Sequence, residues 1–382
     1  MTTNNRYCHH IEHSIHYDVN GRTAPCCQFR GDNDPFYVEP DEYFQSDWLT
    51  KIKGQMNRGE EISGCQRCYK DESISGESMR TDSNANMTKK LHLGYSNICN
   101  KSCNICRPQR SHLVGADYKK VLQQDPDNYF IQEKFKRQKT TAKILQSGNL
   151  KLESIVNWVV GDNFKKFKNI IHKVDHIDLD GGEPFMHPEL HMLLDMLLKE
   201  DYKGSLNITS NGSWTKEYLD KLSRFKKIQI ILSIDGVNDL YKLVRPPHSW
   251  DWIEERINLI KQYPKIKVKT STVVHIFNAH QIPEIIRVVQ AYGFICNFYP
   301  LGQQEYLHTS LCPDSVLEKI INEIKSIDSL TYKKVINYLQ GCINRPNTPE
   351  QIKMFHAYID SFGPVKDINY QQYIPWDFGT IK

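Results

Sequence analysis

Three closely spaced cysteines are the residues of this sequence that point most directly to chemistry. Cys99, Cys103 and Cys106 form the pattern C-x3-C-x2-C on one short segment. Three thiolates on such a segment can bind three irons of a cubic [4Fe–4S] cluster, a cluster that usually has four cysteine ligands. The fourth iron then stays open to a further ligand, as one position does in catalytic zinc sites. The alternatives are a zinc site with a distant fourth ligand, and cysteines without a shared role.

Four cysteines nearer the N-terminus form a second candidate metal site. Cys8 and Cys26 precede Cys65 and Cys68, and the last two have the C-x2-C spacing that is common in metal sites. On spacing alone, a structural zinc site and an iron–sulfur cluster fit this pattern equally well.

The other four cysteines receive no assigned role. Cys27 is the neighbour of Cys26 and can rarely reach the same metal, while Cys296 lies in an apolar segment typical of a protein core. Cys312 and Cys342 have no partner at a metal-ligand spacing, and a hydrogen-atom donor is a weak alternative for either of them.

Composition places these cysteines in a reducing compartment. The chain has 382 residues, 11 of them cysteine, and is far longer than the small domains that disulfides staple together. The polar first residues lead into no apolar run, and no window approaches the roughly 18 apolar residues of a membrane span. We therefore expect a cytoplasmic protein without a membrane partner. Its net charge of +4 argues neither for nor against nucleic acid.

The elements that must position the cysteine triplet alternate between strand and helix. Apolar segments predict six strands, at 90–95, 176–179, 205–209, 228–234, 267–275 and 295–299. Helical spacing predicts helices between them, at 188–198, 217–225, 252–262 and 282–292. A repeated βα pattern indicates a parallel sheet, and six strands fit a partial (β/α)6 TIM-like barrel in the α/β class. The triplet follows the first strand, on the face where such folds place their chemistry.

The sequence divides into three expected domains. A small cysteine-rich domain spans 1–85, with a strand at 14–19, a turn at Asn20-Gly21 and a helix at 46–56. The partial barrel spans 86–300, and a helical C-terminal extension spans 301–382. A largely helical insertion of roughly 65 residues, at about 107–172, interrupts the barrel. Its basic run at 134–139 is interpreted as a solvated helix face, with a substrate-contacting surface as the alternative.

Short glycine-containing motifs follow three consecutive predicted strands. Gly181-Gly182-Glu183-Pro184 follows the second strand, Ser210-Asn211-Gly212 the third, and Ser233-Ile234-Asp235-Gly236 the fourth. Glycine allows a backbone to approach a ligand closely, and a carboxylate pairs with an ammonium group. Each motif is weak alone, but their order on successive strand ends is a strong combined signal.

Together with the cysteine triplet, these motifs resemble the radical S-adenosylmethionine (radical SAM) superfamily over roughly residues 90–300. The resemblance implies that Gly181, Gly182, Glu183 and Pro184 hold the amino group of SAM, and that Ser210 and Asn211 contact its ribose or carboxylate. Ser233 and Asp235 match the cofactor-binding S-x-D-G motif. Arg245 is implied to grip the SAM carboxylate, and Val273 to pack against the adenine.

Two positions depart from the pattern of the family. The residue before the third cysteine is usually aromatic there, whereas this chain has Ile105. The pair Tyr241-Lys242 stands where the family often has His-Asp shortly before the arginine. Neither difference removes an iron ligand.

The resemblance implies an enzyme that cleaves SAM reductively to a 5′-deoxyadenosyl radical, which takes a hydrogen atom from a substrate. The implied partners are SAM and an electron donor such as flavodoxin or ferredoxin. A peptide or protein is the expected substrate, and a nucleotide, nucleic acid or small molecule is the alternative. A hypothesis from another class is a non-catalytic zinc-binding interaction protein.

The N-terminal cysteines resemble a second module. Cys8, a strand, Gly21-x4-Cys26 and then Cys65-x2-Cys68 are similar to the half-SPASM, or twitch, domain, which holds an auxiliary [4Fe–4S] cluster. The resemblance favours a second [4Fe–4S] cluster over zinc at these four residues, although the module usually follows the barrel and here precedes it. Four ligands saturate a cluster, which favours electron relay or a structural role over substrate binding.

Overall fold

A computed structural model describes residues 6–17, 23–29, 42–76, 78–94, 96–151, 164–302 and 304–381 of the chain. The expected turn at Asn20-Gly21 lies outside these residues, as does part of the insertion. The chain forms two compact units, each assembled from separate segments. The first unit contains Met1–Ser96, Leu152–Thr209 and Glu217–Gln229, and the second contains Asn97–Lys151, Ser210–Lys216 and Ile230–Lys382.

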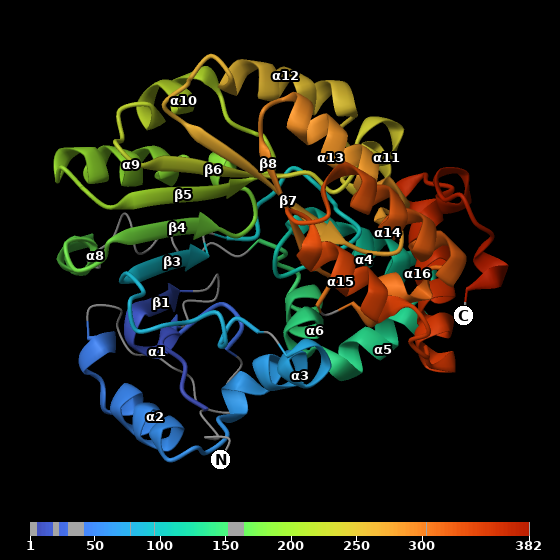
Figure 1. Cartoon of the computed structure of the whole chain (residues 1–382), viewed down its shortest axis with the longest axis horizontal. Coiled ribbons are helices and arrows are strands. Elements are labelled where there is room, and N and C mark those ends of the chain that lie inside the picture. Colours follow the sequence, from blue (N-terminus) through green and yellow to red (C-terminus); the bar gives the residue numbers. More distant parts are fainter. Residues whose placement is uncertain are drawn as a thin grey trace. The chain divides into compact units, whose positions relative to one another are not determined.

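The strands form an eight-stranded, mostly parallel sheet in the order β2-β1-β3-β4-β5-β6-β7-β8. All six predicted strands are present, and they run as β3 (Lys90–Gly94), β4 (His176–Asp180), β5 (Ser205–Ser210), β6 (Ile228–Ser233), β7 (Lys267–Val274) and β8 (Ile295–Pro300). The α/β class, the partial barrel and the helical C-terminal region are therefore confirmed (Figure 1).

Two N-terminal strands extend the sheet within the first unit. β1 (Ser14–Tyr17) pairs in parallel with β3, and β2 (Thr23–Ala24) pairs antiparallel with β1. The strand expected at 14–19 is thus present, but it adds to the edge strand of the partial barrel. The reason is the apolar Ile15, which is fully buried beside the equally buried Leu91 of β3.

The helices of the first unit follow from their apolar spacing. They are α1 (His10–His13), α2 (Asp47–Asn57), α3 (Gln66–Ser75), α8 (Phe164–Ile171), α9 (Glu189–Lys199) and, at its border, α10 (Lys216–Leu222). In α2 the buried residues are Leu49, Ile52 and Met56, the face that the sequence predicts. The Ser46 side chain accepts a hydrogen bond from the Leu49 N–H and so caps the helix.

One face of the sheet in the first unit is polar. Along β4, Ile177 and Leu179 are fully buried, whereas the alternate residues are half-buried. These alternate side chains form ion pairs with β3, where Lys90 binds Asp178 and His92 Nε2 lies 3.0 Å from Asp180 Oδ2. Asp180 and the Cys27 thiol outweigh burial and raise the pKa of His92 to about 10. The half-buried face therefore carries fixed charges of both signs.

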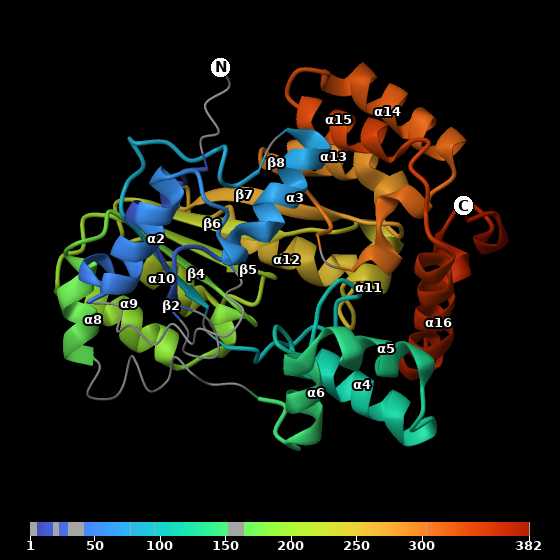
Figure 2. The same ribbon diagram turned by 90° about the horizontal axis from the view of Figure 1, so that it is seen from below.

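The second unit is mainly helical. Its insertion helices are α4 (His112–Gln124), α5 (Tyr129–Arg137) and α6 (Lys139–Gln146). Figure 2 shows them gathered with α16 (Pro349–Lys366), and α16 contacts both α4 and α5. The remaining helices are α11 (Asn238–Val244), α12 (Trp250–Ile260), α13 (Ile282–Ala291), α14 (Asp314–Asp328) and α15 (Lys333–Cys342).

Aromatic side chains join the C-terminal extension to the insertion. Phe130 of α5 contacts Tyr306, Tyr358 and Phe362, with ring centroids 5.0 to 5.6 Å apart. The last residues also dock, because Tyr370, Ile374, Trp376 and Phe378 are all buried. The C-terminal segment is consequently a strap on the second unit and not a loose tail.

The basic run of the insertion departs from its interpretation as a solvated helix face. Lys134 is buried, with its ammonium 4.1 Å from the centre of the Tyr306 ring. Burial, together with the neighbouring Arg107 and Arg137, lowers the pKa of Lys134 to about 7. Lys136 and Arg137 are exposed, so only part of the run is solvated. Periodicity did not reveal the burial of Lys134 because its partner, Tyr306, lies far away in sequence.

Two further properties bear on the expected class of protein. None of the 11 cysteines, all of which lie within the described ranges, forms a disulfide bond. Among the helices that the structure describes, none combines the length and apolar character needed to cross a bilayer.

Replacing Leu193 by Ala tests the sheet-facing side of α9. Leu193 is fully buried, so we expect the free energy of unfolding to fall by about 2–5 kcal/mol through lost transfer energy and a cavity. Met192→Ala is the matched control, because its neighbouring side chain is 46% exposed and should cost under about 0.5 kcal/mol. Urea unfolding of both variants measures the difference, and equal losses would contradict the assigned face.

Candidate active site

The cysteine triplet lies on a loop of the second unit that is held by backbone contacts. The segment has no helix or strand of its own between 97 and 111, so its polar backbone groups need partners elsewhere. The Ser102 N–H donates to the Pro246 carbonyl over 2.9 Å, and the Asn104 N–H donates to the Val244 carbonyl over 3.2 Å. The end of α11 thereby fixes the loop on both sides of Cys103.

A second set of contacts ties the loop to the motif at 210–212. The Asn211 side-chain amide donates to Asn100 Oδ1 over 2.9 Å and lies 3.6 Å from the Cys99 sulfur. Gly212 has a φ of 103°, a left-handed conformation that favours glycine, and its N–H donates to Ser210 Oγ. The structure thus brings Cys99, Ser210 and Asn211 together, as the sequence motifs predict.

The three thiols form a donor set suited to a soft metal. Cys99 and Cys103 are buried, and burial together with the neighbouring Cys103 raises the pKa of Cys106 to about 11. A thiol loses its proton when it binds a metal, so metal binding overcomes the raised pKa of the buried thiol. Among the described residues, no three cysteine sulfurs lie within 4.8 Å of one another. Three thiols on one short loop can bind either a single metal or separate irons of a cluster.

Asp235, Arg245 and Val273 meet at one buried point of the second unit. Asp235 is 1% exposed, pairs with Nη1 of Arg245 and accepts the Val273 N–H over 2.8 Å. Burial opposes the charge on Arg245, but the nearby Cys103 and Asp235 raise its pKa. The Nε of Arg245 is buried and has no hydrogen-bond partner among the described residues. That donor is suited to an anionic ligand, while Asp235 itself holds Arg245 in position.

The motif at 181–184 belongs to the first unit. Gly181 and Gly182 have φ values of 87° and 57°, which explains why both positions are glycine. Glu183 is fully buried, and its carboxylate accepts the N–H of Phe185 over 3.3 Å. Pro184 begins the following short helical turn at 184–186. Ser233 ends β6 in the second unit and is half-buried.

The four N-terminal cysteines of the second candidate site meet in the first unit. Cys8, Cys26, Cys65 and Cys68 all line one cavity. Burial raises the pKa of Cys65 to about 12, with the neighbouring Cys8 and Cys68 thiols adding to the effect. Residue 64 must be glycine there, because an added methyl group would lie 2.2 Å from the Phe29 ring, which also lines the cavity.

The other cysteines lie apart from these two sets. Cys27 is not among the residues that line the cavity, and its thiol acts on the pKa of His92 on β3. Cys296, Cys312 and Cys342 are buried. One cluster of possible ligands lies next to Cys8, where the ligand atoms of His9, Glu12 and His13 fall within 4.8 Å of one another. There Lys53 already pairs with Glu12 at 2.9 Å.

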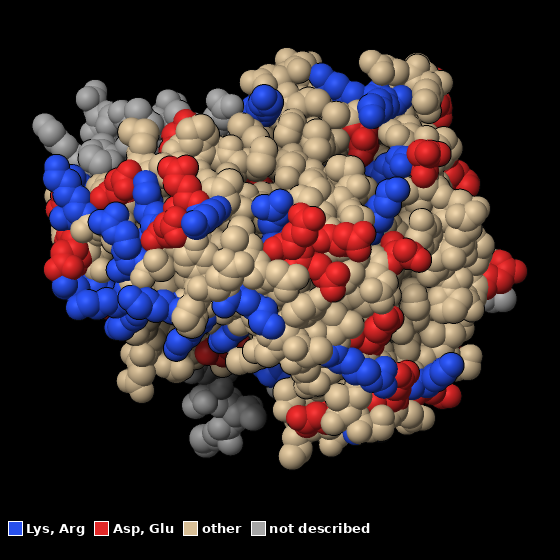
Figure 3. Space-filling view, turned by 90° about the horizontal axis from the view of Figure 1, so that it is seen from above, with Lys and Arg blue, Asp and Glu red and all other residues tan. Residues whose placement is uncertain are grey.

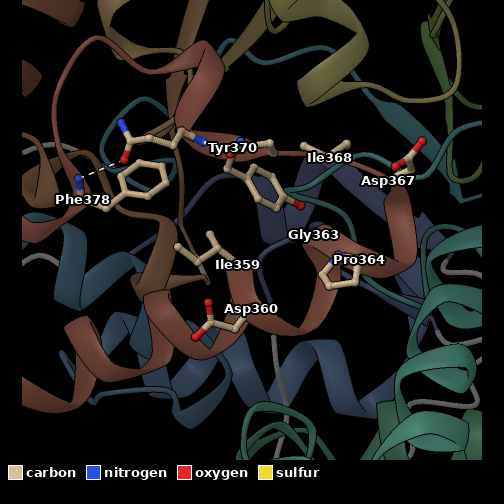
Figure 4. Close-up of a pocket in the computed structure, with 10 residues that line it drawn as sticks. Ile359, Asp360, Gly363, Pro364, Asp367, Ile368, Tyr370 and Phe378 are labelled. Atoms are coloured by element: carbon tan, nitrogen blue, oxygen red, sulfur yellow. Dashed lines mark hydrogen bonds between the residues drawn. The ribbon is translucent and has the colours of Figure 1, made fainter.

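A surface groove of about 540 Å³ lies elsewhere, on the C-terminal strap. Figure 4 shows the Tyr370 ring and Ile359 pointing into it, with Asp360 and Asp367 at its sides. The Phe378 N–H donates to Gln371 Oε1 beside it. The groove contains no thiol, so the chemistry of the two cysteine sets does not extend to it.

Comparison with known proteins places these observations in a family. The sequence model of the radical SAM superfamily matches residues 94–289, about half of the chain. Over 92 residues the chain is 36% identical to 7-carboxy-7-deazaguanine synthase of Aquifex aeolicus (strain VF5). That match covers 24% of this chain and 36% of the relative, so the chain spans about a third of the curated protein it matches.

Solved structures give weaker likenesses. The chain is 16% identical to native anSMEcpe with bound AdoMet, with a TM-score of 0.44 over 65% of this chain and 62% of that one. It is 15% identical to Streptococcus suis SuiB bound to S-adenosylmethionine, with a TM-score of 0.38 over 77% of this chain and 60% of that one. Because both scores are below 0.5, these likenesses decide nothing about substrate.

Replacing Asp235 by Asn tests the buried pair with Arg245. The variant keeps the shape and one acceptor but leaves a buried guanidinium without its counter-charge, so we expect a loss of about 3–5 kcal/mol in the free energy of unfolding. Asp201→Asn is the control, because Asp201 pairs with Lys203 on the exposed surface and should change stability by at most about 1 kcal/mol. If denaturant unfolding gives similar losses for both variants, the buried Asp235–Arg245 pair contributes no more to stability than an exposed pair does, and the prediction is wrong.

Proposed function

The chain belongs to the radical SAM superfamily, and we propose that it holds its catalytic [4Fe–4S] cluster on Cys99, Cys103 and Cys106. When bound, the reduced cluster and SAM supply the radical that removes a hydrogen atom from a substrate. The observation that carries the proposal is the anchored loop, which presents three thiols and no fourth cysteine.

The protein's own residues would orient SAM. Arg245 offers its Nε to a carboxylate and is held by Asp235, and Val273 is placed on the same carboxylate through its N–H. Asn211 joins the cysteine loop to the motif at 210–212, and Ser233 lies at the end of β6. In the first unit, Gly181 and Gly182 give a turn that only glycine adopts easily, ahead of the Glu183 carboxylate.

We further propose that Cys8, Cys26, Cys65 and Cys68 hold an auxiliary [4Fe–4S] cluster in a twitch-like N-terminal domain. The shared cavity supports one common metal site for the four thiols, and the twitch-like cysteine pattern favours iron over zinc there. With four thiols available, electron relay or a structural role is favoured. An electron donor such as flavodoxin or ferredoxin, and a cytoplasmic location, stay predictions.

A peptide or protein is our proposed substrate, on the basis of the twitch-like cysteine pattern. The polar face of the first unit supports a polar substrate, because it carries half-buried charges of both signs at His92, Asp178 and Asp180. A small polar molecule is the second candidate, supported by the match to a relative named 7-carboxy-7-deazaguanine synthase. On the face drawn in Figure 3, Lys and Arg are interspersed with Asp and Glu, which favours neither RNA nor DNA.

Formation of 5′-deoxyadenosine tests the catalytic assignment. Anaerobically purified protein, reduced with dithionite in the presence of SAM, should release 5′-deoxyadenosine that mass spectrometry detects. Cys103→Ala should reduce this release at least about a hundredfold, because one of three cluster ligands is lost. Cys342→Ala is the control, since that buried thiol belongs to α15, a helix that carries no member of either cysteine set. Zinc without iron in the wild-type protein would support the non-catalytic hypothesis instead.

A further inference from the structure

The C-terminal helix α16 places a buried lysine against the cysteine loop. Lys366, its last residue, donates to the Ser102 carbonyl over 2.7 Å and lies 3.3 Å from Asn104 Oδ1. The Nζ is also 3.7 Å from Asp117 Oδ2 of α4, and the Lys366 side chain is only 5% exposed. All of these residues belong to the second unit.

These contacts satisfy an otherwise costly buried charge. The ammonium donates to a carbonyl and an amide oxygen, and the Asp117 carboxylate pairs with its charge. Asp117 also accepts the hydroxyl of Ser102, so the lysine and the carboxylate bind the same residue of the loop. The Lys366–Asp117 pair therefore holds both the carbonyl and the hydroxyl of Ser102, the residue directly before Cys103.

Asn104, the residue directly after Cys103, is also held by hydrogen bonds. Its side-chain amide donates to the Leu243 carbonyl over 2.9 Å, while its oxygen accepts the Tyr358 hydroxyl over 3.2 Å. The side chain of Gln304 donates to the Ile105 carbonyl over 2.6 Å. The C-terminal extension therefore contacts the residues on both sides of Cys103, although Lys366 is 264 positions from Ser102.

We propose that Lys366 is a positioning residue for the cluster loop and that the charges of Lys366 and Asp117 set the reduction potential of the cluster in opposite directions. The proposal rests on the proposed function of Cys99, Cys103 and Cys106. Reduction adds negative charge to a cluster, so a nearby ammonium favours the reduced form and a nearby carboxylate opposes it. In a buried site these effects are only weakly screened.

The midpoint potential of the SAM-binding cluster tests the proposal. It is measured on the anaerobic holoenzyme by a redox titration followed by electron paramagnetic resonance, and the signal that changes on addition of SAM identifies the cluster. Lys366→Met should lower the potential and Asp117→Asn should raise it, each by about tenfold in the reduction equilibrium, or about 59 mV for one electron. Lys366→Arg should restore the wild-type value. Lys353→Met, an exposed lysine of the same helix, should leave it unchanged.

A merely structural role predicts a different pattern. Both charge-removing variants would then lose iron or shift the potential in the same direction, and either result overturns the proposal. If Lys366→Met alone does not retain iron, the other two variants decide. A raised potential in Asp117→Asn together with a wild-type potential in Lys366→Arg supports the proposal. Any other pair of values overturns it. A wild-type protein without a SAM-responsive cluster would instead refute the proposed function itself.

Discussion

The hydrogen bonds between the cysteine loop and residues 243–246 are the contacts on which the site depends. A segment that carries three thiols and no regular secondary structure satisfies only some of its backbone groups internally, as in the bond from the Cys106 N–H to the Cys103 carbonyl. Its N–H groups at Ser102 and Asn104 find the carbonyls of Pro246 and Val244, and the Asn104 side chain finds that of Leu243. These bonds hold the backbone of the loop without using the three sulfurs.

Residues 243–246, at the end of α11 and just beyond it, contact the cysteine loop and also include Arg245. The guanidinium of Arg245 is fixed by Asp235, and Asp235 also binds the backbone of β7 at Val273. A change at Asp235 would therefore reach the cysteine loop through residues 244–246. The coupling is a chain of buried hydrogen bonds and one ion pair, in which each member has few alternative partners.

The sequence predicted the strands and the grouping of the four N-terminal cysteines, because strand patterning and ligand spacing are local. All six barrel strands are present, and Cys8, Cys26, Cys65 and Cys68 line one cavity. The helix α11 was not predicted from the sequence. The addition of β1 to the sheet, the burial of Lys134 and the contact between Lys366 and Ser102 depend on pairings distant in sequence, which no local pattern encodes.

The first unit contributes a cavity of four thiols and a polar sheet face, and the second contributes the anchored triplet. The central claim is that both sets of cysteines bind iron. X-ray diffraction from anaerobically grown crystals, recorded on both sides of the iron absorption edge, tests it most directly. The account predicts one anomalous iron peak against Cys99, Cys103 and Cys106, and a second within the cavity of Cys8, Cys26, Cys65 and Cys68. No iron peak at the triplet, or a zinc signal there, would contradict the account.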